Sequence, residues 1–113
     1  MVTEPQVLGL RREADALLIE LSVPRELHQL QGHFPGLPIV PGVLLLKWAL
    51  EFGRAHFELP PIFTRLSGVK FTRVLPLDTA VTLVLRRTAG ELSFEYLEGG
   101  RSCARGRALY ADA

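Results

Sequence analysis

The sequence VLLLKWALEFGRAHF, residues 43–57, is expected to form a helix. Nothing in it breaks a helix except Gly53, and its leucine, alanine, lysine and glutamate residues all favour one. Apolar side chains occur on nearly all sides of this predicted helix, which is typical of a helix that is buried on most sides. Because the chain has 113 residues, it has room for one such helix. We therefore expect a single domain over residues 1–113, with one continuous core.

Short strand-like segments flank the helix on both sides. Before it, residues 7–12 and 16–23 read as the two strands of a hairpin, and Pro24 ends the second strand because proline cannot donate to a ladder. Residues 25–30 are expected to form one or two helical turns. After the helix, four segments are rich in β-branched and aromatic residues and are separated by turn signals. These segments are 64–73, 79–87, 91–98 and 101–110.

The order of two strands, one buried helix and four strands predicts an α+β fold. An antiparallel sheet wrapped around one central helix satisfies this order, since the helix then fills the concave apolar face of the sheet. Alternation is clearest in residues 81–86, where Val81, Leu83 and Leu85 alternate with the other face. That other face carries Thr82, Val84 and Arg86. This pattern predicts a strand with one half-buried face. A split ferredoxin-like or cystatin-like arrangement would require a second helix or an amphipathic one.

The composition argues against several classes of function. With 13 basic and 12 acidic side chains, the chain lacks the charge excess of a nucleic-acid-binding protein. The basic clusters at 86–87 and 101–107 are expected to be solvated strand edges. Cys103 is a lone cysteine, which excludes an intrachain disulfide and is expected to act as a small buried hydrophobe. No signal peptide or membrane-spanning run is visible, so we expect no membrane partner and a cytoplasmic location.

Motifs for other chemistries are missing from the sequence. Its three histidines and one cysteine show no metal-coordinating spacing, so no metal and no cofactor are expected. There is no Gly-x-Ser-x-Gly elbow for a serine nucleophile and no phosphate-cradling glycine-rich loop.

The loop before the helix, residues 31–42, is dense in glycine and proline and carries His33. The glycines and prolines hold the backbone in a fixed shape and so position the imidazole, while apolar neighbours favour its neutral, basic form. The loop leads into the helix at Pro41 and Gly42, where unpartnered N–H groups can stabilise a carbonyl oxygen that gains negative charge. Together these features suit removal of a proton beside a thioester carbonyl.

Several motifs carry a resemblance to a known family. Residues 33–36 (HFPG), Pro38 and residues 41–44 (PGVL) resemble the signature of the β-hydroxyacyl-acyl carrier protein dehydratases. Residues 47–49 (KWA) resemble the helix of the small dehydratase-like proteins of aryl polyene gene clusters, and residues 69–73 (VKFTR) are similar to the strand after that helix. The resemblance covers residues 32–85, and beyond them only the number of strands agrees.

This resemblance implies a hotdog fold, a dimer, and a substrate that is an acyl thioester of acyl carrier protein or coenzyme A. It implies an active site at the subunit interface, where His33 is the base and the N–H of Gly42 polarises the carbonyl. An acid on the helix of the other subunit completes the site. By the same resemblance, the residues expected to contact substrate are Phe34, Pro41, Val43, Leu46 and Phe71.

One position departs from the family pattern. The family's acid falls fourteen residues after the histidine, where this chain has Lys47, and Glu51 follows one turn later on the same helix face. Three alternatives stay open. Glu51 replaces the acid with Lys47 as its charge partner; a heterodimer with another hotdog subunit supplies the carboxylate; or the chain has lost catalysis and only binds acyl chains or another subunit.

A purely structural alternative is that Lys47 and Glu51 form an intrahelical ion pair at the rim of the subunit interface. Against it, two opposite charges on an apolar helix would be costly if buried without a purpose. Catalysis is therefore favoured, with dehydration first and thioester hydrolysis, in which Glu51 would activate water, second.

Overall fold

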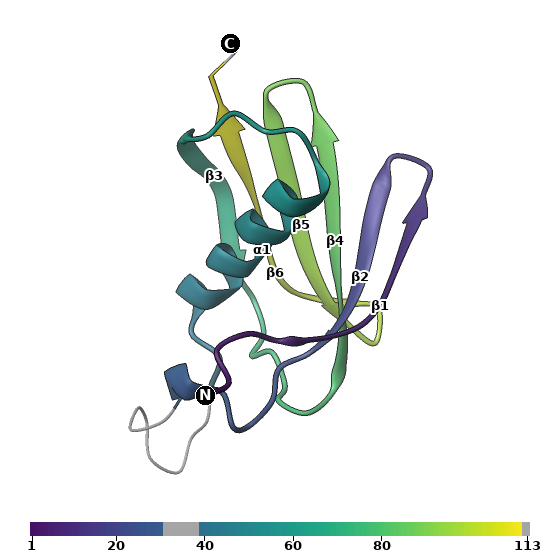
Figure 1. Cartoon of the computed structure of the whole chain (residues 1–113), viewed down its shortest axis with the longest axis vertical. Coiled ribbons are helices and arrows are strands. Elements are labelled where there is room, and N and C mark those ends of the chain that lie inside the picture. The colour runs from purple at the N-terminus through teal and green to yellow at the C-terminus, as the bar shows by residue number, and fades with distance from the viewer. Residues whose placement is uncertain (31–38, 112–113) are drawn as a thin grey trace.

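The computed structural model describes residues 1–30 and 39–111. One helix, α1 (Gly42–His56), lies against a six-stranded antiparallel sheet (Figure 1). The α+β prediction, an antiparallel sheet around one helix as in the hotdog fold, is therefore confirmed. The strands are β1 (Gln6–Glu13), β2 (Ala16–Ser22), β3 (Phe63–Phe71), β4 (Ala80–Thr88), β5 (Glu91–Glu98) and β6 (Arg101–Tyr110), and one short 3-10 helix spans His28–Leu30.

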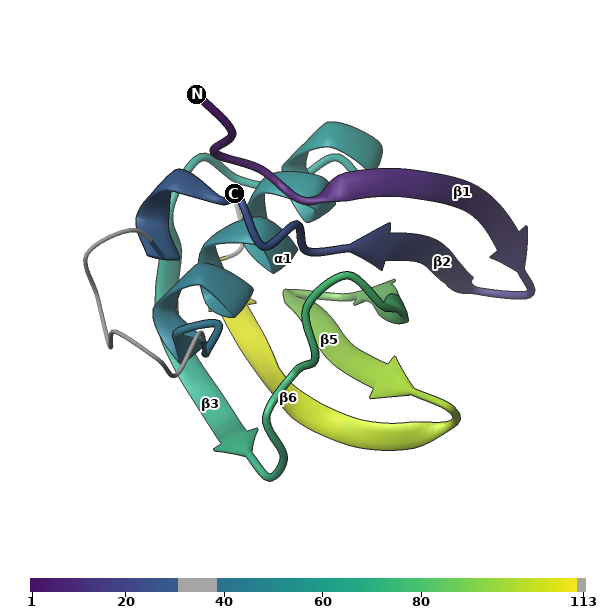
Figure 2. The ribbon, with the colours of Figure 1, turned by 90° about the horizontal axis from the view of Figure 1, so that it is seen from below.

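The strand order across the sheet is β1-β2-β4-β5-β6-β3. β1 and β3 are thus the two edges, although β3 precedes β4 in the chain. The sheet curls around α1, which lies in its concave side (Figure 2). A β-bulge interrupts the pairing of β3 with β6 between Ser67 and Lys70, at the point where Gly68 has a φ of 63°.

The core lies between α1 and the concave side of the sheet. On the helix, the buried residues are Leu44, Leu45, Trp48, Ala49 and Gly53, a helical spacing that forms one face. The sheet contributes fully buried side chains from β2, β4 and β5, which include Leu17, Ile19, Leu83, Leu85, Leu92 and Tyr96. The Tyr96 hydroxyl donates a hydrogen bond of 2.7 Å to the Leu45 carbonyl, which joins β5 to the helix. Burial raises the pKa of Tyr96 far above its ordinary value.

The expectation that the helix is buried on most sides is wrong for one face. The sheet covers one face of α1, and on the opposite side Val43 is 69% exposed. Lys47, Glu51 and Arg54 are exposed along the same helix. The apolar sequence of α1 therefore includes side chains that no described part of this chain covers.

The predictions for β4 and Cys103 can be compared directly with the structure. Val81, Leu83 and Leu85 are buried as predicted, but Val84 on the other face is buried too. Cys103 is fully buried, as expected. The prediction that the basic clusters are strand edges is wrong, because β4 and β6 are both interior strands. That position could not be read from local sequence, since it follows from long-range strand pairing.

Candidate functional site

An apolar pocket of about 520 Å³ lies beside the start of α1. Its walls come from the residues before the helix, the first turns of the helix, and the chain at and after the end of β3. The lining residues are Ile39, Val40, Pro41, Gly42, Leu45, Phe71, Thr72, Arg73, Val74 and Leu75. Three residues predicted for the site, Pro41, Gly42 and Phe71, are therefore brought together by the fold.

Gly42 is the first residue of α1, and Pro41 precedes it with extended backbone (φ −62°, ψ 142°). No side chain caps this helix start, and the first N–H groups of any helix lack intrahelical acceptors. The ring of Phe71 packs directly on Gly42. A Cβ at this position would lie 2.8 Å from Phe71 Cζ and 3.0 Å from both Cε atoms. A side chain at residue 42 would therefore have to displace the Phe71 ring where the helix meets the pocket.

The pairing of the chain with β6 continues past Phe71 and holds the pocket wall in place. The backbone N–H groups of Thr72 and Arg73 donate to the Cys103 carbonyl at 2.8 and 3.2 Å. The Thr72 hydroxyl donates to the Ser102 carbonyl at 3.1 Å. These bonds hold the backbone directly after Phe71 against β6.

Arg73 contributes the pocket's charged side chain. Its guanidinium lies 3.6 Å from a carboxylate oxygen of Glu98, and each side chain is about one third exposed (35% and 33%). No carboxylate lines this pocket within residues 1–30 and 39–111. The described walls can hold an apolar chain and polarise a carbonyl, but they lack an acid.

Lys47 and Glu51 form the i,i+4 ion pair that their spacing predicted, with 3.7 Å between Nζ and Oε1. Their side chains are 50% and 52% exposed, so the argument that this pair is costly because it is buried fails in the described chain. Neither residue lines the pocket beside Gly42. Glu51 instead borders a smaller hollow of about 190 Å³ with Glu4 and Trp48.

The other predicted residues fall into two groups. Val43 and Leu46 do not line the pocket; Val43 is exposed and Leu46 packs against the core. His33 and Phe34 lie outside the described residues.

The residues that sequence reasoning missed are apolar wall residues from two segments. Ile39 and Val40 directly precede Pro41, and Val74 and Leu75 follow Arg73. Ile39 and Val40 belong to the same glycine- and proline-rich stretch as Pro41, so their proximity to it was a usable signal. Val74 and Leu75 had no such signal, because only the long-range pairing of β3 with β6 brings them to the helix.

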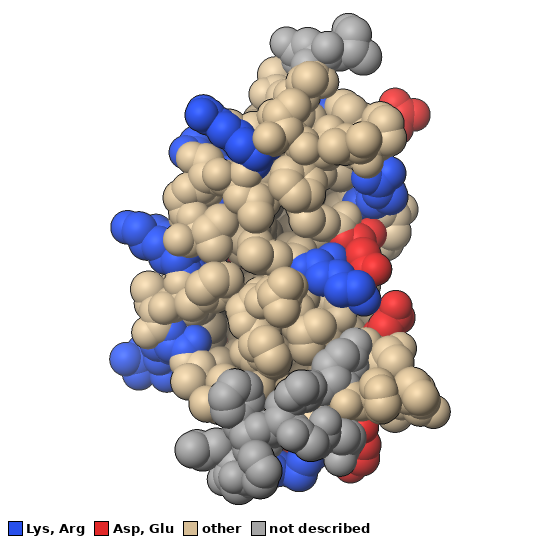
Figure 3. Space-filling model, turned by 90° about the vertical axis from the view of Figure 1, so that its left-hand side faces the viewer, with Lys and Arg blue, Asp and Glu red and all other residues tan. Residues whose placement is uncertain are grey.

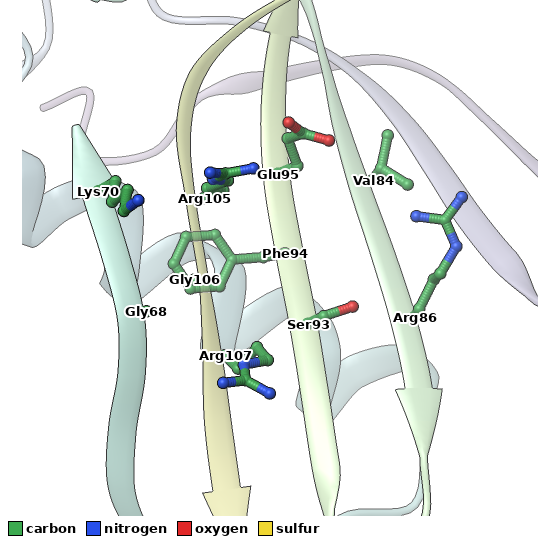
Figure 4. Close-up of a pocket in the computed structure, with 10 residues that line it drawn as sticks. All are labelled: Gly68, Lys70, Val84, Arg86, Ser93, Phe94, Glu95, Arg105, Gly106 and Arg107. Carbon is green, nitrogen blue, oxygen red and sulfur yellow. The ribbon is translucent and has the colours of Figure 1, made fainter. Parts of the chain in front are cut away.

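A second, polar groove of about 370 Å³ crosses β3, β4, β5 and β6 (Figure 4). Its basic side chains are Lys70, Arg86, Arg105 and Arg107, around Ser93 and Glu95. Arg107 lies 3.5 Å from Glu91, and Arg86 lies 3.8 Å from Asp15. The basic clusters that are separate in sequence therefore converge, together with Lys70, on one surface of the sheet.

Comparison with known families agrees with this geometry. A model of the ApeI-like family, described as ApeI dehydratase, matches residues 10–107. This chain belongs to the ApeI-like dehydratase family. A 3-hydroxyacyl-[acyl-carrier-protein] dehydratase FabZ from Chloroflexus aggregans (strain MD-66 / DSM 9485) is 38% identical over 90 residues, 73% of this chain and 57% of that protein. The ApeI-like chain thus spans little more than half the length of that relative.

Two solved structures share the fold of this ApeI-like chain. One belongs to the dehydratase heterocomplex ApeI:P from Xenorhabdus doucetiae, with a TM-score of 0.84 and 22% identity over 95% of this chain and 97% of that one. The other is an uncharacterized protein from Erwinia carotovora subsp. atroseptica, with a TM-score of 0.80, 25% identity and 95% of each chain covered. Both confirm the hotdog fold.

The described residues show neither a metal-binding cluster nor a membrane-spanning helix. In residues 1–30 and 39–111, no group of three or more His, Cys, Asp or Glu side chains could hold a metal ion. No helix in the same residues is long and apolar enough to cross a membrane.

Proposed function

We propose that this ApeI-like chain dehydrates a 3-hydroxyacyl thioester, carried on acyl carrier protein or coenzyme A, to the 2-enoyl thioester. The observation that supports this most is the start of α1 at Gly42, on the wall of an apolar pocket and beneath the ring of Phe71. A helix start of this kind presents backbone N–H groups to a bound carbonyl. The apolar walls suit the first carbons of an acyl chain.

In the proposed reaction, His33 removes the proton from the carbon next to the thioester carbonyl. Negative charge then moves to the carbonyl oxygen, where the N–H of Gly42 stabilises it. As the carbon–carbon double bond forms, the C3–oxygen bond breaks, and the leaving hydroxyl takes a proton from an acid and departs as water. Leu45, Phe71 and Leu75 give the pocket apolar walls, and an apolar surrounding strengthens the electrostatic contact between the N–H and the charged oxygen. Phe34, Val43 and Leu46 remain predicted contacts for the acyl chain.

The scheme also needs an acid, and no carboxylate lines the pocket among residues 1–30 and 39–111. The helix face with Lys47 and Glu51 is exposed, so its side chains are available to a second subunit rather than to the pocket of the same chain. If two copies associate, Glu51 of one copy is the candidate acid for the other. If the partner is a different hotdog subunit, the partner supplies the carboxylate.

A second candidate function is a binding subunit that has lost its own acid and completes a heterodimeric dehydratase. Lys47 at the family's acid position favours it, as does a pocket whose described lining has no carboxylate. The related Xenorhabdus structure, a dehydratase heterocomplex, gives this candidate a precedent in fold.

The test is whether the purified chain turns over a 3-hydroxyacyl thioester, followed by the rise of enoyl absorbance. We expect His33→Ala to abolish turnover, whereas His28→Ala, a change at an exposed histidine, serves as the matched control. Glu51→Gln abolishes turnover only if Glu51 is the acid. If the wild-type chain is inert and Lys47→Glu restores activity, the second candidate is correct. Full activity in His33→Ala would overturn the proposed mechanism.

A further inference from the structure

The polar groove lies on the outer face of the sheet, away from α1. On β6, Arg105 and Arg107 alternate with Ala104 and Ala108, which belong to the buried core. Because successive side chains of a strand point to opposite faces of the sheet, both arginines face away from that core. Val84 of β4 lines the same groove and is 7% exposed. Part of the groove floor is therefore apolar.

The lining of the polar groove is strongly basic. Among the described residues that line it, four are cations and Glu95 is the one carboxylate. Figure 4 shows the cations on β3, β6 and β4, with Ser93 and Glu95 of β5 between them. Figure 3 faces the side of the molecule with β3 and α1. It shows Lys and Arg side chains without Asp or Glu along one margin, whereas the Asp and Glu side chains in this view lie along the other. A surface of this charge attracts a negatively charged ligand.

Two of these cations are direct neighbours across the strands. The register of β3 with β6 places Lys70 opposite Arg105, and side chains opposite each other have Cβ atoms about 4.5–5.5 Å apart. Like charges in such a pair destabilise a sheet. Neither side chain forms an ion pair with a carboxylate in residues 1–30 and 39–111, although Glu95 lies opposite Arg105 on its other side. An anion between Lys70 and Arg105 would replace their repulsion with two attractive contacts.

Arg107 is held at the same end of the polar groove. Its Nη1 lies 3.5 Å from a carboxylate oxygen of Glu91, and its Nη2 donates a hydrogen bond of 3.1 Å to the Ser67 hydroxyl. The guanidinium passes over the β-bulge of β3, since a Cβ on Gly68 would lie 3.9 Å from its Nε. A guanidinium has five N–H donors, so Arg107 keeps donors for a ligand while these two contacts orient it.

We propose that the polar groove binds the phosphate group of an organic phosphate monoester between Lys70, Arg105 and Arg107. Such a phosphate carries about two negative charges at neutral pH and three strong acceptor oxygens, one for each cation. Arginine and lysine are the side chains with which proteins usually bind phosphate. The groove, at about 370 Å³, is larger than a phosphate ion needs. Its remaining part, where Ser93 and Glu95 offer hydrogen-bonding oxygens, suits the hydroxyl groups of the esterified alcohol.

This inference does not depend on the proposed dehydration. The polar groove and the pocket beside Gly42 have no lining residue in common. The phosphate monoester could be a free metabolite or the head of a lipid, since the recognised group is the same in both. The test below therefore uses a soluble ester and a lipid that carry the same glycerol phosphate.

The test is a ¹H–¹⁵N NMR titration of the full chain with glycerol 3-phosphate, at a constant ionic strength of about 0.1 M so that screening does not change. We expect saturable shifts at the amides of Gly68, Lys70 and Arg107, and none with glycerol. Arg105→Ala and Lys70→Ala should each weaken binding roughly tenfold, because each removes one charge-assisted contact to the phosphate. The amide spectrum of each variant also shows whether it is folded, and either folded variant suffices for the comparison.

The matched control is Arg101→Ala. It removes the same charge from an exposed position of β6 that does not line the polar groove, and it should bind the ester like the wild-type chain. Sedimentation with phosphatidylcholine vesicles, with and without phosphatidic acid, identifies the source. Arg105-dependent binding to phosphatidic acid supports a lipid ligand, and binding of the soluble ester alone supports a free one.

Three results would overturn the proposal. One is the absence of both saturable shifts with glycerol 3-phosphate and Arg105-dependent binding to phosphatidic acid. Another is unchanged affinity in folded Arg105→Ala or Lys70→Ala. The third is an equal loss in Arg101→Ala, which would show that the ester responds only to net charge. Turnover of a 3-hydroxyacyl thioester is not measured in these experiments, so the dehydration test stands or fails separately.

Discussion

Gly42→Ala is the change that tests the described pocket wall most directly. The new Cβ would lie 2.8 Å from Phe71 Cζ, about 0.6 Å inside the shortest ordinary contact of 3.4 Å. Phe71 is 50% exposed, so its ring can yield, and we expect the overlap to cost about 1–2 kcal/mol, in the lower part of the range for overpacking.

The helix propensity of the new residue has the opposite effect on stability. Alanine in place of glycine favours a helix by about 0.5–1 kcal/mol. The sum is a net loss of roughly 0–1.5 kcal/mol in the free energy of unfolding for Gly42→Ala alone. In a Phe71→Ala background the overlap is gone, and the same change should stabilise the chain by about 0.5–1 kcal/mol. The coupling between the two substitutions is then about 1–2 kcal/mol.

Urea unfolding of the four proteins of this double-mutant cycle measures the coupling. Trp48 is the chain's one tryptophan and is 1% exposed, so its fluorescence reports the loss of the core. Gly9→Ala is the control, since its Cβ would have no neighbour within 4 Å, and it should show no coupling to Phe71→Ala. If Gly42→Ala changes the free energy of unfolding equally in both backgrounds, the ring does not rest on Gly42, and the described pocket wall is wrong.

Three further predictions concern the core. Gly106→Ala should destabilise the chain by about 2–3 kcal/mol in urea unfolding, because its Cβ would lie 2.9 Å from Cζ of the buried Phe94 ring. Tyr96→Phe, which removes the hydrogen bond to Leu45, should cost about 1 kcal/mol. Burial raises the pKa of Tyr96, so above about pH 10 only the unfolded chain ionises there. The stability of the wild-type chain should therefore fall as the pH rises through that value. Tyrosinate absorbance in the near ultraviolet should appear when the chain unfolds. The pH dependence of stability should be weaker in Tyr96→Phe. Burial also raises the pKa of the Cys103 thiol, so an aromatic disulfide reagent should modify this thiol slowly until urea unfolds the chain. Fast modification of the native chain would contradict the burial of Cys103.

Local pattern was enough to locate the helix and most strand limits. The strands predicted at 91–98 and 101–110 coincide with β5 and β6, and the predicted helix differs from α1 by one residue at each end. These elements could be predicted because residue preferences and turn signals act between near neighbours. The same reasoning placed Pro41 and Gly42 at the helix start and, by resemblance, Phe71 near them.

Strand order and burial depend on contacts between distant parts of the chain. No local signal shows that β3 lies at the edge beside β6, or that Lys70 joins the arginines of β4 and β6 in one groove. The apolar sequence of α1 suggested burial of Lys47 and Glu51, yet the sheet covers the opposite face and leaves this pair half exposed. The periodicity of the sequence indicates which side chains are apolar enough to avoid water. Only the folded sheet determines which of these side chains are actually covered.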